Sequence, residues 1–203
     1  MSDFFETPTL FGSFKTSIEE PSNYWQVKQF HSDQIVELDL IKNSKEALPG
    51  DGIIWKNSQL ERKDQVVVYT ADCLPILIEG ENGGALLHAG WRGIHQKIYL
   101  KDEIKQLKPL KVVIGPSIYV DSFEVTNEFL DYFPGSKNFV TRDEEQKLFF
   151  DLQNEVKLNL LHFFPKIDFQ ESFICTFENI QYNSFRRTNS TKRNYNSYQL
   201  REA

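Results

Sequence analysis

Three side chains of metal-binding type, His31, Cys73 and His88, are the residues of this chain whose chemistry is easiest to interpret. One thiolate and two imidazoles suit a borderline-soft divalent ion such as Zn²⁺, and Cu²⁺ would accept the same donors. Three protein ligands leave a fourth coordination position for water or substrate, which is typical of a catalytic zinc site. The spacing of the three positions matches no compact metal-finger motif, so the prediction depends on residue type.

Two other interpretations of the same residues stay open. Cys73 could be a small buried apolar residue, with both histidines in ordinary core or surface positions. Alternatively, Cys73 could be the nucleophile of a metal-free hydrolase, with His88 as its base.

The elements expected around these residues are mainly strands. Short β-rich runs occupy residues 35–38, 52–55, 65–69, 75–79 and 84–88. Cys73 lies between two of these runs, His88 ends another, and His31 ends an apolar stretch over 24–30. A rigid sheet can aim polar side chains at the ends of its strands, so we expect the three residues to converge.

Three helices and one further strand complete the expected elements. Ile94, Ile98, Ile104 and Leu107 follow a helical period that Pro109 ends. A short helix is expected from residue 126, a longer one over 151–163 with its first residue as N-cap, and a buried strand over 111–115. Strands followed by mixed strands and helices predict an α+β fold: a single domain over residues 1–203, with a mixed β-sheet core and flanking helices.

A glycine-rich turn follows His88 and leads into a predicted helix. Free N–H groups at the start of that helix, together with Arg92, would form an anion site suited to phosphate. The alternative is that the glycines only permit a tight turn and that Arg92 pairs with a structural carboxylate.

Three more residues are candidates for the site. Asp72 precedes Cys73 and could orient a ligand imidazole or carry a proton, although a turn carboxylate at a strand end is the alternative. Arg186 and Arg187 open a basic stretch and are candidates for substrate contact, with a solvated basic surface as the alternative.

Composition restricts the class of protein. The chain has 203 residues, 40% of them hydrophobic, which is enough for a buried core. Its net charge of −6 argues against nucleic acid as a partner. No apolar run approaches the roughly 20 residues that span a bilayer, and the first residues lack the pattern of a secretory signal. We therefore expect a cytoplasmic protein without a membrane partner and with reduced thiols.

Several motifs together resemble one family. Thr-Ala-Asp-Cys-Leu-Pro-Ile-Leu at 70–77, His-Ala-Gly-Trp-Arg-Gly at 88–93, Ile-Gly-Pro-Ser-Ile at 114–118 and Ser-Phe-Arg-Arg at 184–187 are similar to the YfiH/DUF152 family. That family carries a laccase-like, multicopper polyphenol oxidase label, and its members are regarded as purine nucleoside phosphorylases with adenosine deaminase activity. The resemblance covers most of the chain.

The resemblance implies a site and a reaction. The family's metal ligands fall on Cys73, His88 and, in a Gln-Phe-His element, His31. It implies a zinc-dependent enzyme that cleaves adenosine or inosine, with methylthioadenosine as a further substrate, using phosphate, and that also deaminates adenosine. Asp72, Cys73 and His88 would be catalytic. Substrate or phosphate would be bound by Arg92, Arg186 and Arg187.

The sequence also departs from the family's pattern. The usual Arg-Gly-Gly-Ser-like stretch is not found before Tyr24, so the N-terminal segment is expected to be shorter than in the family. Lys192 stands where a Thr-Gly-Arg-like element has glycine, which reduces backbone freedom there. Both departures bear on substrate fit more than on metal binding.

Copper-dependent phenol oxidation is the main alternative function. A full multicopper set needs more histidines than the four in this chain, so only a single copper ion in the same three-ligand site is compatible with it. A non-enzymatic binding protein that keeps the fold is the last alternative.

Overall fold

The computed structural model describes residues 5–142 and 147–201, which form three sheets. The largest sheet has six strands in the order β12-β8-β6-β7-β4-β3. Its strands are β3 (Ile35–Glu37), β4 (Gly52–Lys56), β6 (Leu74–Gly80), β7 (Gly83–Ala89), β8 (Pro109–Ile114) and β12 (Asp168–Glu171). The pairs at the two edges, β12 with β8 and β3 with β4, are parallel and the inner pairs are antiparallel, so the sheet is mixed.

The second sheet has four antiparallel strands in the order β1-β2-β13-β5, and the third has three in the order β10-β11-β9. Their bounds are β1 (Phe5–Pro8), β2 (Gly12–Ser17), β5 (Gln65–Thr70), β9 (Glu124–Val125), β10 (Phe139–Arg142), β11 (Lys147–Phe150) and β13 (Asn194–Leu200).

The helices are short apart from one. They are α1 (Leu38–Asn43), α2 (Trp91–His95), α3 (Asp102–Gln106), α4 (Leu152–Phe163) and α5 (Phe185–Thr188), with 3₁₀ turns at Ile98–Leu100, Val120–Ser122 and Asn127–Tyr132. Within the described residues, no helix has the length and apolar character needed to cross a membrane.

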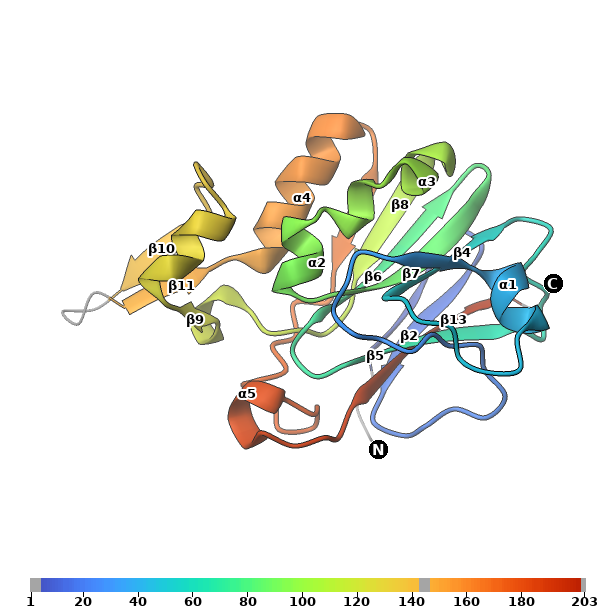
Figure 1. Ribbon diagram of the computed structural model, residues 1–203, viewed down its shortest axis with the longest axis horizontal. Coiled ribbons are helices and arrows are strands. Elements are labelled where there is room, and N and C mark those ends of the chain that lie inside the picture. The colour runs from blue at the N-terminus through green and yellow to red at the C-terminus, as the bar shows by residue number, and fades with distance from the viewer. Residues whose placement is uncertain (1–4, 143–146, 202–203) are drawn as a thin grey trace.

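The six-stranded sheet is the middle layer of the molecule. Helices α2, α3 and α4 lie along one of its faces and the four-stranded sheet lies along the other (Figure 1). Ile76 and Ile78 of β6 pack in the core on the helical side, whereas Leu77 packs in the core between the sheets. Because both faces are covered, every residue of β6 and β7 is buried, which explains their continuous apolar runs.

The predicted fold class is confirmed: the structure is α+β, with a mixed sheet and flanking helices. All five predicted early strands are present within a few residues of their expected bounds. The predicted N-cap of α4 is also correct, because the carboxylate of Asp151 accepts a hydrogen bond from the backbone N–H of Asn154 at 2.8 Å.

The prediction of one continuous helix from Ile94 to Leu107 is wrong. The segment forms α2, a 3₁₀ turn and α3 instead, with Lys97 in the left-handed region at φ 55°. Three consecutive residues, Ile98 to Leu100, are buried, and a regular surface helix would expose at least one of them. The short helix expected after residue 126 is a 3₁₀ helix.

Candidate metal centre

His31, Cys73 and His88 converge although they are distant in the sequence. One potential ligand atom from each lies within 4.8 Å of the others. The two imidazole rings have centroids 4.8 Å apart and planes at 80°, so they approach edge to face and do not stack. Their donor set is one sulfur and two nitrogens, and the group fits a single divalent ion such as Zn²⁺.

The pairing of β6 with β7 brings Cys73 next to His88. Cys73 lies in the turn between β5 and β6, directly before the first residue of β6. In the β6–β7 register Leu74 faces Ala89 and Pro75 faces His88, so the thiol is one residue beyond the paired end of the strand. The two ligands from the sheet are thus placed by antiparallel pairing.

His31 is in a loop, and its segment is held against β5. Trp25 donates its backbone N–H to Gln65 and accepts one from Val67, at 2.8 and 2.9 Å. Closer to the site, the side-chain amide of Gln29 bonds both the N–H and the carbonyl of Tyr69, at 2.7 and 2.8 Å.

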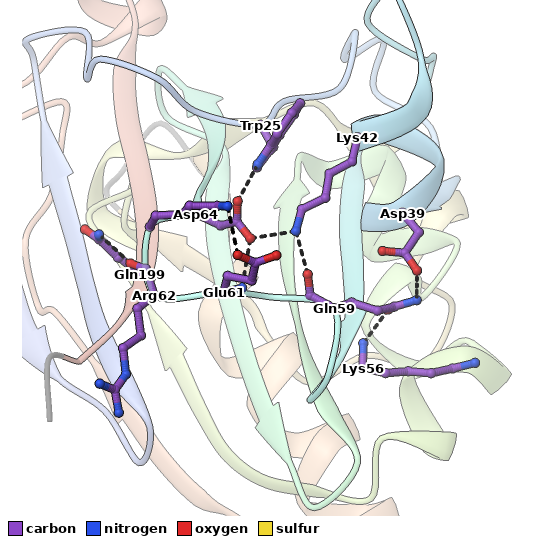
Figure 2. Close-up of polar contacts among 10 residues, drawn as sticks. Trp25, Asp39, Lys42, Lys56, Gln59, Glu61, Arg62, Asp64 and Gln199 are labelled. Carbon is purple, nitrogen blue, oxygen red and sulfur yellow. Dashed lines mark hydrogen bonds and ion pairs between the residues drawn. The ribbon is translucent and has the colours of Figure 1, made fainter.

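A second anchor fixes the start of the His31 segment. The indole N–H of Trp25 donates to the carboxylate of Asp64 at 3.0 Å, and the ammonium of Lys42 in α1 donates to the same carboxylate at 2.6 Å (Figure 2). The chain segment that leads to His31 is therefore held by both β5 and α1. His31 itself has a positive φ of 63°.

Asp51 hydrogen-bonds to both histidine residues, a role that residue type and spacing did not predict. Its side chain is fully buried, and Oδ1 contacts His88 Nδ1 at 2.8 Å and accepts the backbone N–H of His31 at 3.0 Å. With Nδ1 engaged, Nε2 of His88 is the nitrogen available to an ion. The only signal in the sequence was an acidic residue between two glycines directly before a strand.

Charges around the thiol favour its ionised form. Burial by itself raises the pKa of the Cys73 thiol, but the neighbouring His88 and His31 imidazoles outweigh it and lower the pKa to about 6. For His88, burial lowers the pKa, while the charges of Cys73 and Asp51 and the hydrogen bonds to them raise it to about 9. Because the thiolate is the form that binds metal, the thiol of Cys73 is prepared for a cation, whereas His88 must release a proton when it binds one.

Gly90 leaves the space in which the ligands meet. It is the residue before α2, and a Cβ at this position would lie 3.1 Å from Cys73 Sγ and 3.2 Å from His31 Cδ2. A methyl group here would be in tighter contact than side chains normally accept. Gly90 belongs to the glycine-rich turn that was predicted to bind an anion. In the structure, its missing side chain leaves space for Cys73 and His31.

The three candidate ligands lie in the wall of a cavity of about 620 Å³. This volume is in the range of small-molecule sites. The wall includes the cationic side chains of Lys28, Arg186 and Arg193 and the aromatic ring of Phe123. A larger cavity of about 820 Å³, between β4 and α3, contains none of the candidate ligands, and we therefore assign it no role in the chemistry.

Asp72 lies in the cavity wall but does not contact an imidazole. Its two carboxylate oxygens accept hydrogen bonds from the hydroxyl of Thr176 at 2.8 Å and from the backbone N–H of Arg186 at 2.7 Å. Its φ is 90°, a strained value for a residue with a side chain. These bonds tie the turn that carries Cys73 to the start of α5.

The three predicted arginines occupy different environments. Arg186 lies in the cavity wall, with its guanidinium 5.4 Å from the ring centre of Phe123. Arg187 donates to the backbone carbonyls of a nearby loop, among them those of Thr176 at 2.7 Å and Phe177 at 2.6 Å. Arg92 is exposed, stacks 4.4 Å above the ring of Trp91, and is not among the cavity-lining residues. Of these three arginines, only Arg186 lines the same cavity as the candidate ligands.

The fold places the chain in a known structural class, that of the YfiH/DUF152 proteins. It superposes on the Neisseria meningitidis protein NMB0706, of DUF152, with a TM-score of 0.75 and 24% identity, over 89% of this chain and 76% of that one. The TM-score is also 0.75 for the hypothetical protein YfiH of Bacillus licheniformis, at 19% identity over 94% and 92% of the two chains. A family model described as multi-copper polyphenol oxidoreductase laccase matches residues 13–199, and the chain belongs to this family.

Curated relatives carry a different name. A protein of Rickettsia prowazekii named purine nucleoside phosphorylase RP494 is 32% identical over 193 residues, covering 87% of this chain and 73% of the relative. An Aquifex aeolicus protein named purine nucleoside phosphorylase is 33% identical over 132 residues, covering 63% of this chain. The match spans 59% of the length of the Aquifex relative.

Proposed function

We propose that this chain is a zinc-dependent enzyme of purine nucleosides that cleaves adenosine or inosine with phosphate and also deaminates adenosine. The observation that carries the proposal is the convergence of His31, Cys73 and His88 in the wall of a cavity lined by cationic side chains. The names of the relatives support the substrate class. A bound divalent ion would supply Lewis-acid chemistry there, and copper is the alternative ion.

The cationic side chains of the cavity suit phosphate. In phosphorolysis a phosphate oxygen forms a bond to C1′ of the ribose, the C1′–N9 bond breaks, and the purine leaves with its electron pair and takes up a proton. We assign Arg186, with Lys28 and Arg193, to hold the phosphate, because all three line the cavity. The ring of Phe123, beneath the Arg186 guanidinium, offers a surface on which the base could stack.

Asp72 takes a positioning role in this proposal. Both of its carboxylate oxygens accept hydrogen bonds from protein donors. This favours a role for Asp72 in holding the turn that carries Cys73 over a role in proton transfer.

Deamination of adenosine would replace the amino group at C6 by the oxygen of water and release ammonia.

Product analysis tests the proposal directly. Purified protein loaded with Zn²⁺ is incubated with adenosine or inosine, with and without phosphate, and the free base, ribose 1-phosphate and inosine are quantified. We expect phosphate-dependent release of the base from both nucleosides and conversion of part of the adenosine to inosine. Absence of both free base and inosine would refute the proposal.

Two arginine variants locate the phosphate site. Arg186→Ala should raise the KM for phosphate, whereas Arg92→Ala should leave it unchanged because Arg92 does not line the cavity. The opposite result would place phosphate at the start of α2, as the glycine-rich turn suggests.

A metal-free hydrolase is the second candidate function, and one observation favours it. The arrangement resembles a nucleophilic triad, in which a carboxylate holds one imidazole nitrogen and a thiol lies near the imidazole. Here these groups are Asp51, His88 and Cys73. Removal of metal by a chelator separates the two functions, because a triad hydrolase would keep its activity and the zinc enzyme would lose it.

We also propose a cytoplasmic location, where the thiol of Cys73 stays reduced.

A further inference from the structure

The carboxylate of Asp51 accepts hydrogen bonds from both histidine residues of the candidate metal centre. Oδ1 contacts His88 Nδ1 and the backbone N–H of His31. Oδ2 accepts from the backbone N–H and the hydroxyl of Ser32, at 2.6 and 2.7 Å, and more weakly from the N–H of Phe30 at 3.3 Å. One buried side chain thus holds a ligand ring and the backbone that carries a second ligand.

The main chain of Asp51 adds to this connection. Its carbonyl accepts the backbone N–H of His88 at 2.7 Å, and its own N–H donates to the carbonyl of Gln34 at 2.8 Å. The residue therefore lies between β7, which supplies His88, and the loop that supplies His31. A displacement of Asp51 would move the two imidazoles relative to each other.

We propose that Asp51 is a positioning residue that sets the two imidazoles for a divalent cation, so that the affinity for the ion depends on its carboxylate. The inference rests on the proposed function in that it takes His31, Cys73 and His88 as the ligands. Asp51 fixes His88 with its proton on Nδ1 and its Nε2 toward the ion. It also holds the loop at His31 in its left-handed conformation.

Asparagine cannot replace this carboxylate. The partners of Asp51 in the backbone and on Ser32 are donors, so both of its oxygens act as acceptors. An asparagine has one acceptor oxygen and an NH₂ group that would face N–H donors. Asp51→Asn keeps the size of the side chain and loses the contacts of one oxygen: either those to His88 Nδ1 and the His31 N–H, or those to Ser32 and Phe30 that hold the loop at His31.

Zinc titration tests the inference without measuring activity. The Zn²⁺ affinity of the full chain is measured by competition with a fluorescent chelator for the wild type and for Asp51→Asn. Loss of a carboxylate that orients a metal-bound imidazole typically lowers metal affinity about 10- to 100-fold, and we expect a loss of this size. Substitution of Co²⁺ should give a thiolate-to-metal absorption band that is altered in the variant.

Glu79→Gln is the matched control. Glu79 is another buried carboxylate, in β6 near the end opposite Cys73, that accepts hydrogen bonds from Thr9, from Tyr198 and from two backbone N–H groups. Its replacement should reduce stability and leave the affinity for Zn²⁺ unchanged. Equal losses of affinity in the two variants would show a general effect of a damaged core and would overturn the inference.

A measurement on the wild type covers the case in which Asp51→Asn does not fold. Long-range ¹H–¹⁵N correlation spectra of the zinc-loaded protein should show His88 with a proton on Nδ1 and the metal on Nε2. Metal on Nδ1 of His88, or wild-type affinity in Asp51→Asn, would overturn the role of Asp51 alone. Failure of the wild type to bind Zn²⁺ would overturn the metal centre itself and this inference with it.

Discussion

The reactivity of Cys73 is the most direct consequence of the site at the level of single residues. The two imidazoles outweigh the effect of burial and lower the thiol pKa to about 6, so the thiolate fraction rises through that pH. In metal-free protein that carries Cys175→Ser, the rate of alkylation by iodoacetamide should reach half its maximum near pH 6. An ordinary cysteine reaches it near pH 8.5, at about its own pKa.

Zinc provides the control for the alkylation experiment. Saturating Zn²⁺ should protect Cys73, because the sulfur would be a ligand. An alkylation rate that keeps rising above pH 8, or one that zinc does not change, would contradict the assignment of Cys73.

Gly90 gives a second prediction at this scale. In Gly90→Ala the added methyl group would meet Cys73 Sγ at 3.1 Å and His31 Cδ2 at 3.2 Å, so these side chains must move apart. We expect the affinity for Zn²⁺ to fall about tenfold or more, measured by chelator competition. Gly135→Ala is the control: it strains a glycine at φ 75° that has no atom within 4 Å of the added Cβ. It should cost stability and leave zinc affinity unchanged.

Residue type predicted the candidate ligands but not their supports. A histidine or a cysteine has few roles, so His31, Cys73 and His88 could be selected before their positions in space were known. Asp51 could not be selected in this way, because its role depends on the fold that places its carboxylate beside Nδ1 of His88. Arg187 was selected for its charge, yet a loop supplies backbone carbonyls to its guanidinium.

At the level of elements, the N-cap of α4 makes a measurable contribution. Asp151 accepts the N–H of Asn154, which would otherwise lack a partner in the first turn. Asp151→Ala should lower the free energy of unfolding by about 1 kcal/mol, measured by urea denaturation. Asp151→Asn should recover most of this loss because asparagine also caps helices well. Equal losses in both variants would show that the cap is not the cause.

Most strands of the middle sheet were predicted from the sequence, whereas in the four-stranded sheet only β5 was predicted. Burial on both faces gives β6 and β7 long apolar runs that stand out in the sequence. In β13, by contrast, Asn194 and Asn196 are fully buried polar residues. Their amides are satisfied by hydrogen bonds, for example between Asn196 and Thr16, which only the folded pairing reveals.

At the scale of the whole molecule, acid should weaken the fold through Asp64. Burial tends to raise the pKa of this carboxyl, but Lys42, Trp25 and a backbone N–H outweigh it and lower the pKa below its usual value. A carboxyl with a lowered folded pKa stabilises the protein above its unfolded pKa, about 3.9, and this contribution is lost as pH falls through the folded value.

Denaturation as a function of pH checks this effect. The difference in unfolding free energy between the wild type and Asp64→Asn should be largest near neutral pH and should shrink as the pH falls below about 4. Metal-free protein is used for both so that zinc release does not contribute. A difference that stays constant down to pH 2 would show that the carboxylate contributes no pH-dependent stability.

The place of β13 has a consequence for synthesis on the ribosome. This strand lies between β2 and β5, and pairs with Thr16 and Val68 through Asn196. Until residues 194–200 leave the exit tunnel, the facing edges of β2 and β5 have no partner, although both have long been translated. Nascent chains that are stalled before this point should therefore be bound by chaperones and cut by proteases, and the completed chain should resist both.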